Sequence, residues 1–259
     1  MPSYLDSLVD STRARVARAK DEVPEEELRR RAHEAAEPRD FRAALERDGF
    51  SIVAEIKRAS PTRGDLNRDL DAGAAARVFA DAGAAALSVL TEPDHFAGSL
   101  EDLRAATRSG VPVLRKDFIV DPWQIPESRA AGADAVLLIV RALRDSELAS
   151  LLAATRAHGM DALVEVHDAG ELERALAVGA GLIGVNHRDL ETFEIHPRRT
   201  AELADRVPSR CVLVALSGVS SRREVEELEA AGARAALVGE SLVTAPDPGA
   251  KLRELLGAP

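Results

Sequence analysis

The sequence predicts a single α/β domain, a (β/α)8 TIM barrel with a helical extension at its N-terminus. Three observations predict this fold: eight short apolar segments follow residue 50, helical patterns separate them, and a Gly-Ala pair recurs at a nearly constant spacing. The length of 259 residues suits one such barrel. With 46% hydrophobic but only 3% aromatic residues, the core should consist of small and branched side chains.

The eight apolar segments are the candidate strands. Each is almost continuously apolar, as expected for a parallel strand that is buried on both faces. They are Ser51–Ile56, Ala86–Leu90, Pro112–Leu114, Ala135–Val140, Ala162–Val166, Leu182–Val185, Val212–Leu216 and Ala235–Val238. Helical patterns between them include Ala72–Ala82, Asp145–His158, Ala169–Val178 and Arg222–Ala231. Such an alternation of strand and helix predicts a parallel sheet.

The Gly-Ala pair marks an internal repeat. It occurs at residues 83, 132, 179 and 232, just before a candidate strand each time, with spacings of 49, 47 and 53 residues. Each interval holds two strand–helix units, which is a quarter of an eight-fold barrel. We expect the glycine to end the preceding helix. A solenoid or a doubly wound sheet is the alternative, and eight units after a helical N-terminus favour the closed barrel.

The first 48 residues carry helical patterns and no candidate strand. Leu5, Leu8, Val9 and Val16 recur at helical spacing. Pro24, followed by three glutamates, is typical of a helix start, because acidic side chains favour the first turn. We therefore expect residues 1–48 to pack on the barrel as a helical extension, within one domain that spans residues 1–259.

Charge and cysteine content exclude several classes of function. The formal net charge of −10 argues against a nucleic-acid or anionic-membrane surface, since both reward basic patches. Cys211 is the only cysteine, so no intrachain disulfide or cysteine-based zinc cluster can form. No His-x-x-x-His spacing occurs, so we expect no metal. We expect a cytoplasmic protein without membrane or nucleic-acid partners, as a monomer or weak homodimer.

Chemistry in such a barrel lies at the C-terminal ends of the strands. Three of these ends direct two lysines and two carboxylates at one mouth: Glu55, Lys57, Lys116 and Glu165. A lysine that is desolvated near a carboxylate can act as a general acid, and a glutamate there can exchange protons. For any one of these residues, a structural ion pair that closes the top of the barrel is an equally good interpretation. The four residues together favour a functional site.

Two glycine turns indicate a phosphate site. Ser217-Gly218 follows the seventh strand and Gly239-Glu240 follows the eighth, each before a helix start. Backbone N–H groups there can hold a phosphate, which is the usual position for one in this barrel. One such turn would mean little, because turns need glycine anyway, but the two together indicate a phosphorylated small-molecule substrate. The loop at residues 60–64 is either a mobile lid or only a turn.

Six short segments between residues 52 and 190 carry motifs of a resemblance that extends over nearly the whole chain. They are Ile52–Pro61, Leu87–Glu92, Phe96–Ser99, Val113–Phe118, Glu165–His167 and Asn186–Leu190. Together they resemble the indole-3-glycerol phosphate synthases of tryptophan biosynthesis. The resemblance implies a lyase that converts 1-(2-carboxyphenylamino)-1-deoxyribulose 5-phosphate to indole-3-glycerol phosphate, carbon dioxide and water, and that uses no cofactor or metal.

The resemblance also implies roles for individual residues. Lys116 would be the general acid that polarises the ketone, and Lys57 would hold the substrate carboxylate and take part in proton transfer. Glu165 would be the acid/base in dehydration, Glu55 would orient the lysines, and Asn186 would contact a substrate hydroxyl. Residues implied to surround the phosphate are Ser60, Arg188, Ser217, Gly218, Gly239 and Glu240; those implied to line the pocket for the arene are Phe96 and Phe118.

Three positions depart from the family pattern. We also count Leu216 among the substrate-binding residues, because it stands where the family has a glutamate before Ser-Gly. A leucine there can neither hydrogen-bond the substrate nor balance the two lysines. His187 replaces an asparagine and His95 a phenylalanine, and both lie at the periphery of the motifs. Three hypotheses follow: a synthase that tolerates Leu216, a paralogue acting on a modified anthranilate-derived substrate, and a non-catalytic barrel that serves as a binding partner.

Overall fold

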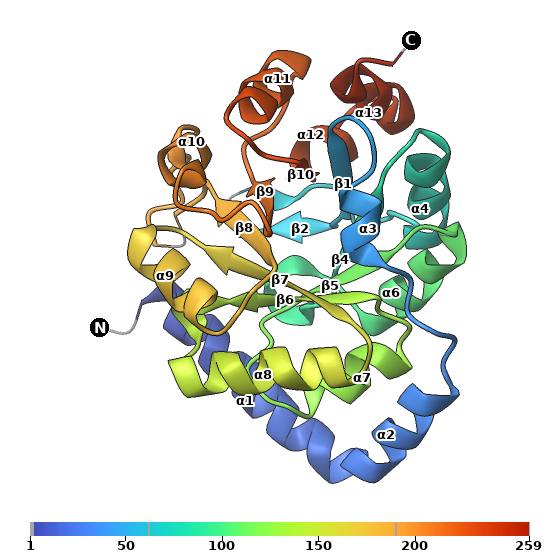
Figure 1. Ribbon diagram of the computed structural model, residues 1–259. Helices are drawn as coiled ribbons and strands as arrows, with labels where there is room; N and C mark the ends of the chain where they lie inside the picture. The colour runs from blue at the N-terminus through green and yellow to red at the C-terminus, as the bar shows by residue number, and fades with distance from the viewer. Residues whose placement is uncertain (1–2, 62, 190, 259) are drawn as a thin grey trace.

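The computed structural model describes residues 3–61, 63–189 and 191–258, and its centre is a closed parallel barrel (Figure 1). The eight strands are β1 (Ser51–Ile56), β4 (Ala86–Leu90), β5 (Val113–Lys116), β6 (Ala135–Ile139), β7 (Asp161–Val166), β8 (Leu182–Asn186), β9 (Val212–Leu216) and β10 (Ala235–Val238). Their order is β1-β10-β9-β8-β7-β6-β5-β4, and β1 also pairs with β4, so the sheet has no edge. The predicted (β/α)8 barrel is confirmed, and each predicted strand overlaps an observed one.

Helices surround the barrel and alternate with its strands. They are α4 (Ala72–Asp81), α6 (Leu100–Ala106), α7 (Gln124–Ala130), α8 (Asp145–Ala157), α9 (Ala169–Ala177), α10 (Arg199–Ala204), α11 (Arg222–Ala230) and α13 (Pro248–Leu256). Short turns add α5 (Pro93–Phe96), α12 (Glu240–Val243), η1 (Thr107–Ser109) and η2 (Val140–Ala142). The four helices predicted by residue range are confirmed, because their apolar faces pack on the strands.

The interior of the barrel depends on one glycine in β8. A Cβ atom on Gly184 would lie 2.8 Å from Cδ1 of Leu216 and 3.3 Å from Cδ1 of Leu163. Both leucines are at most 1% exposed. The missing side chain therefore leaves the space that two leucines from β7 and β9 fill, which keeps the interior densely packed.

The Gly-Ala repeat is a helix-ending motif. Gly83, Gly132, Gly179 and Gly232 have φ of 98°, 92°, 80° and 96°, in the left-handed region that favours glycine. In each copy the alanine N–H bonds to the carbonyl five residues earlier, as Ala84 N does to Phe79 O at 2.9 Å. This is the Schellman arrangement, and it turns the chain directly into the next strand.

Three helices precede the barrel. They are α1 (Tyr4–Glu22), α2 (Glu25–Glu34) and α3 (Phe41–Leu45), and Figure 1 shows α1 and α2 on the side of the barrel where α7 and α8 lie. α1 starts at a capping box of Ser3 and Asp6. Its buried Leu5 and Leu8 belong to the same apolar cluster as the barrel strands. α2 packs on α7. Among the described residues, no helix is long and apolar enough to cross a membrane.

The loop after β1 folds back on itself. Two-residue strands β2 (Ala59–Ser60) and β3 (Gly64–Asp65) pair antiparallel, so the segment is a small hairpin at the barrel mouth. Ser60 is buried, whereas Gly64 and Asp65 are exposed. Thr62 of this loop and Leu190 of the sixth motif lie outside the described residues.

Replacing the glycines of the Gly-Ala repeat should lower stability, because other residues adopt a positive φ only with strain. A Cβ on Gly232 would meet nothing within 4 Å, whereas one on Gly132 would lie 2.9 Å from Thr107 Cγ2. We expect Gly232→Ala to lower the free energy of unfolding by about 1–2 kcal/mol, from left-handed strain alone. Gly132→Ala should cost more because it adds a steric clash, and Gly232→Asn should cost less than Gly232→Ala. Urea unfolding followed by circular dichroism measures the order; equal losses at both glycines would contradict it.

Candidate active site

A buried carboxylate between two lysines lies at the centre of the barrel mouth. Glu55 at the end of β1 is 2% exposed. Its Oε1 lies 2.7 Å from Lys57 Nζ, and its Oε2 accepts a hydrogen bond from Lys116 Nζ. The two lysines come from different strands, β1 and β5, so the barrel closure itself brings them to the same carboxylate.

The charge state of this triad follows from its surroundings. Burial alone would raise the pKa of Glu55, but the charges and hydrogen bonds of Lys116 and Lys57 outweigh it and lower the pKa to about 2. Glu55 is therefore ionised at neutral pH. The triad carries two positive charges and one negative charge, which leaves an excess of positive charge for an anionic substrate.

Gly239 makes room for that carboxylate. A Cβ atom at this position would lie 2.2 Å from Glu55 Oε1 and 2.9 Å from its Cδ. Gly239 directly follows β10, the neighbour of β1 in the barrel. The sequence predicts Gly239 as part of a phosphate-binding turn, but the structure shows a second requirement for glycine. Any side chain at this position would clash with Glu55 and prevent its contact with the two lysines.

A second buried network fixes the end of β5. Arg115 lies beside Lys116 and is 1% exposed; it donates to Asp117 Oδ2 at 2.9 Å and to Thr91 Oγ1 at 3.1 Å. Arg15 of α1 donates to the other oxygen of Asp117, at 2.9 Å. Burial alone would raise the pKa of Asp117, but Arg115 and Arg15 lower it. The ionic contacts of Arg115 and Asp117 therefore fix the backbone on both sides of Lys116, from which its side chain extends into the mouth.

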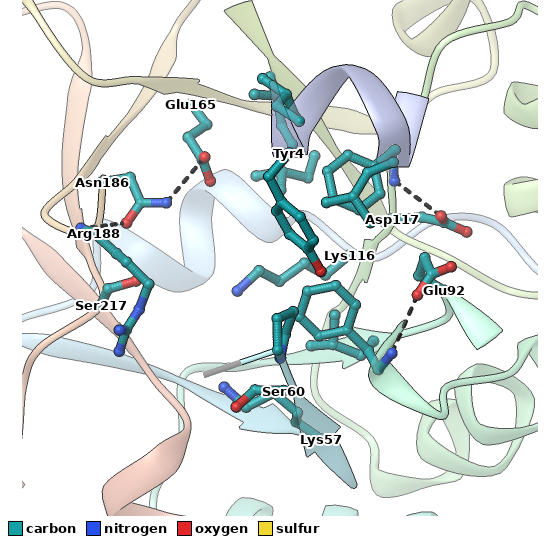
Figure 2. A pocket seen from close by; sticks show the side chains of 18 of the residues that line it. Tyr4, Lys57, Ser60, Glu92, Lys116, Asp117, Glu165, Asn186, Arg188 and Ser217 are labelled. Atoms are coloured by element: carbon teal, nitrogen blue, oxygen red, sulfur yellow. Dashed lines mark hydrogen bonds between the residues drawn. The ribbon is translucent and has the colours of Figure 1, made fainter. Parts of the chain in front are cut away.

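Glu165 of β7 faces the triad across the mouth. It is 2% exposed, and its Oε1 accepts a hydrogen bond from Asn186 Nδ2 at 3.0 Å. Asn186 cannot turn its amide around, because its Oδ1 accepts from the backbone N–H of Arg188 at 3.0 Å. Figure 2 shows this chain from Glu165 through Asn186 to Arg188 on one side of the pocket, with Lys116 pointing into the space beside it.

Two adjoining cavities open at the mouth and share Lys57, Lys116, Arg188, Ser217 and Glu240. The first is mainly apolar. Its apolar lining comes from Tyr4, Leu5, Leu8, Leu90, Phe96, Phe118, Leu137, Ile139 and Phe193. The rings of Phe96 and Phe118 lie 6.5 Å apart, and this cavity is suited to a flat aromatic group.

The second cavity is polar and lies over β9 and β10. Its lining includes Ser217 to Ser220, Gly239 to Ser241, and Arg63 of the β2–β3 hairpin. Arg63 Nε lies 2.9 Å from Glu240 Oε1, and Arg188 Nη2 lies 3.8 Å from Glu240 Oε2. Ser217 and Gly218 have φ of 69° and 79°, a consecutive left-handed pair at the end of β9. Small residues beside two arginines can hold a phosphate.

Thirteen of the fourteen predicted site residues line one or both cavities. The exception is Leu216, which belongs to neither set of described lining residues, since its side chain points inward onto Gly184. A leucine at the last residue of a strand reads the same in sequence whether it faces the mouth or the interior. The direct contact expected between Leu216 and substrate stays a prediction without geometric support.

The sequence did not single out several lining residues. Tyr4 packs edge-on against Phe193, with ring centroids 5.2 Å apart, and against His95 at 6.2 Å. These three residues come from distant parts of the chain, and only the folded N-terminal helix brings Tyr4 over the pocket (Figure 2). Arg63 was visible only as part of a loop. Among the described residues, no group of three or more histidine, cysteine, aspartate or glutamate side chains could hold a metal ion.

Comparison with known proteins identifies the family. Residues 5–255 match the family model described as indole-3-glycerol phosphate synthase. This chain belongs to the indole-3-glycerol phosphate synthase family. A protein of that name from Rhizorhabdus wittichii is 48% identical over 261 residues, covering 99% of each chain. Another of the same name, from Mycolicibacterium vanbaalenii, is 48% identical over 257 residues, covering 99% of this chain and 94% of its own.

Solved structures outside the synthase family share the fold. A 3-hexulose-6-phosphate synthase from Salmonella typhimurium aligns with a TM-score of 0.64 at 14% identity, covering 80% of this chain and 97% of its own. A thiamine phosphate pyrophosphorylase from Pyrococcus furiosus aligns with a TM-score of 0.62 at 15% identity, covering 83% and 96%. At these identities the likeness concerns the barrel alone.

His187, a buried histidine directly after β8, should make stability depend on pH. Burial first, and then the charge of Arg199, lowers the pKa of His187 to about 4. The folded state therefore binds fewer protons than the unfolded state between about pH 4 and pH 6.5, and stability falls as pH falls through that window. The shift from 6.5 to about 4 corresponds to about 3 kcal/mol.

The measurement is urea unfolding at pH 7 and at pH 4. His187→Asn should lose less free energy of unfolding between the two values than the unsubstituted protein, by about 2–3 kcal/mol. His33→Asn is the matched control, because His33 is exposed on α2 and should leave the pH dependence unchanged. An equal pH dependence in all three proteins would show that His187 does not couple folding to proton binding.

Proposed function

We propose that this protein closes the indole ring of 1-(2-carboxyphenylamino)-1-deoxyribulose 5-phosphate, with release of carbon dioxide and water, to form indole-3-glycerol phosphate. The observation that carries the proposal is the place of Lys57 and Lys116, which share Glu55 where an apolar cavity meets a polar one. A substrate with an aromatic acid at one end and a phosphate at the other matches two such cavities. Membership of the synthase family supports the same reaction.

Lys116 acts as the general acid of ring closure. Its ammonium polarises the ketone and donates a proton to that oxygen, while the arene carbon that bears the carboxylate forms the new carbon–carbon bond. The ionised Glu55 keeps the ammonium charged and directed until the ketone arrives. The aromatic walls of the first cavity exclude water, and this strengthens the interaction.

Lys57 holds the substrate carboxylate until it leaves. Ring closure disrupts the aromaticity of the arene, and departure of carbon dioxide returns an electron pair to the ring. No external electron acceptor is needed for this step. Lys57 is only 14% exposed at its side chain, so its charge acts on the carboxylate with little screening by water.

Glu165 moves the proton of dehydration. It donates a proton to the departing hydroxyl, which leaves as water, and accepts the proton lost from the carbon next to the ring nitrogen. Asn186 donates one amide hydrogen to Glu165, and its second can donate to a substrate hydroxyl. The two residues together orient the ribulose-derived chain between the lysines and the polar cavity.

The polar cavity binds the phosphate. Arg63 and Arg188, which form ion pairs with Glu240 in this structure, line this cavity and can donate hydrogen bonds to a phosphate there. Backbone N–H groups after Ser217 and around Gly239 add donors without bulk. We also propose a cytoplasmic protein that is a monomer or weak homodimer, in keeping with its single cysteine and net charge of −10.

Leu216 does not by itself favour a modified substrate. That alternative depended on a less polar mouth, and the leucine fills the barrel interior over Gly184 instead. A non-catalytic barrel is disfavoured by the intact set of lysines and carboxylates around one opening.

Removing the proposed general acid should abolish most turnover. We expect Lys116→Ala to lower kcat by about 10²–10⁴-fold, because general acid catalysis contributes on that order. The assay follows the fluorescence of the indole product formed from the carboxyphenylamino-deoxyribulose phosphate. Lys251→Ala is the control, since Lys251 lies on α13 and pairs with Glu254. Undiminished turnover in Lys116→Ala would refute the role of Lys116.

Restoring the family glutamate should not be needed for activity. We expect the protein with Leu216 to turn over the parent substrate, and Leu216→Glu to give no gain. Leu216 is 1% exposed, so a carboxylate there would also reduce stability, which thermal unfolding measures. If the unsubstituted protein shows no turnover and Leu216→Glu gains activity, the natural substrate of the unsubstituted protein is a different one.

A further inference from the structure

His167 is a buried histidine between two glutamates at the end of β7. Its side chain is 0% exposed. Nδ1 lies 3.0 Å from Glu171 Oε2, and Nε2 lies 3.5 Å from Glu165 Oε1. Glu165 is the proposed acid/base of dehydration, so His167 touches the reaction only through another side chain.

Glu171 determines which ring nitrogen carries a proton. Its carboxylate accepts from the backbone N–H of His167 at 2.8 Å and from Arg141 Nε at 2.6 Å. Burial alone would raise the pKa of Glu171, but its hydrogen bonds with His167 and Arg141 lower it to about 2. An ionised carboxylate can only accept, so Nδ1 of His167 must donate.

The other ring nitrogen then faces Glu165. Within the part of the chain that the structure describes, Nε2 is buried and has no hydrogen-bond partner. If both Nε2 and Glu165 lacked a proton, a lone pair would oppose a carboxylate in a buried site, which is unfavourable. One proton between the two groups removes that conflict, either as an imidazolium facing a carboxylate or as a carboxyl group facing a neutral ring.

We propose that His167 is a positioning residue that, anchored by Glu171, shares one proton with Glu165 and so keeps this acid/base supplied for dehydration. The inference rests on the proposed function of Glu165. The shared proton belongs to the pair rather than to either residue, as for other closely coupled groups.

The proton balance of dehydration follows directly. Glu165 gives the shared proton to the departing hydroxyl, whose bond to carbon breaks, and water leaves. His167 is then neutral, with its proton on Nδ1, and its Nε2 lone pair faces the Glu165 carboxylate. The proton released by the ring carbon next to nitrogen returns to this pair, and the starting state is restored without a proton from solvent.

The charges around His167 come from three elements. Arg141 of η2 pairs with Glu171, and its other nitrogens lie 3.5 Å from Asp168 and 3.9 Å from Asp189. Arg141 therefore compensates several carboxylates, and Glu171 and Glu165 remain the two that contact the imidazole directly.

Nitrogen-15 NMR of the full-length protein, labelled at histidine, tests the arrangement without substrate. We expect Nδ1 of the His167 ring to carry a proton and the Nε2 resonance to report the proton that is shared with Glu165. Glu165→Gln should shift the Nε2 resonance, because it removes the group that shares the proton. A bare Nδ1, or an Nε2 resonance that Glu165→Gln leaves unchanged, would overturn the proposal.

Kinetics separate proton sharing from a purely structural role. Glu171→Gln keeps the shape of the anchor but removes its charge, and His167→Asn removes the titrating ring. Both should lower kcat by about 10-fold or more, leave KM within about threefold, and move the alkaline limb of the kcat profile to lower pH by about one unit. A loss that is the same at every pH would contradict the proposal.

Two controls complete the design. His158→Gln removes a histidine at the end of α8, bonded through Nδ1 to the Ala154 carbonyl, and should leave the kcat profile unchanged. Circular dichroism and thermal unfolding verify that each variant is folded. If the protein shows no ring closure at all, the proposed function fails while the NMR experiment still decides the state of His167. If ring closure is present and His167 carries its proton on Nε2, only the present inference fails.

Discussion

The mouth of this barrel depends on one ionised carboxylate that is almost fully removed from water. Glu55 could not remain charged at 2% exposure without the two ammonium groups beside it, and neither lysine would keep its direction without Glu55. Gly239 allows this contact because it has no side chain. The whole chain has a net charge of −10, yet the site has more positive than negative charge in the triad. An anionic substrate is therefore attracted locally and not by the protein as a whole.

The N-terminal extension is part of the site. Arg15 of α1 donates to Asp117, which in turn holds Arg115, and these contacts lie directly beside Lys116 in β5. The same helix places Tyr4 and Leu5 in the lining of the apolar cavity. Because α1 contributes both a cavity wall and an ionic contact, its packing on the barrel also affects the position of Lys116. Loss of α1 would thus affect the chemistry as well as the fold.

The sequence was sufficient for the barrel because each strand is a short apolar run and each Gly-Ala pair ends a helix. It was sufficient for the lysines and carboxylates because they stand in motifs at strand ends. The sequence could not predict the side-chain positions that depend on tertiary contacts. Tyr4 looked like any other residue of an amphipathic helix, and the direction of Leu216 depends on the space that Gly184 leaves in the neighbouring strand β8. Phe193 reaches the pocket from a left-handed backbone with φ of 61°, which no pattern of residue types indicates.

The site contains two separate systems of proton-bearing groups on opposite sides of the opening. Lys116 and Glu55 belong to β5 and β1, whereas Glu165 belongs to β7 and His167 directly follows β7, four strands from β1 around the barrel. Ring closure and dehydration act on the same ribulose-derived carbon in succession, and each needs a proton at a different moment. One shared acid would have to take up a new proton between the two steps. Two systems, each with its own buried counter-charge, allow the second step to follow without that uptake.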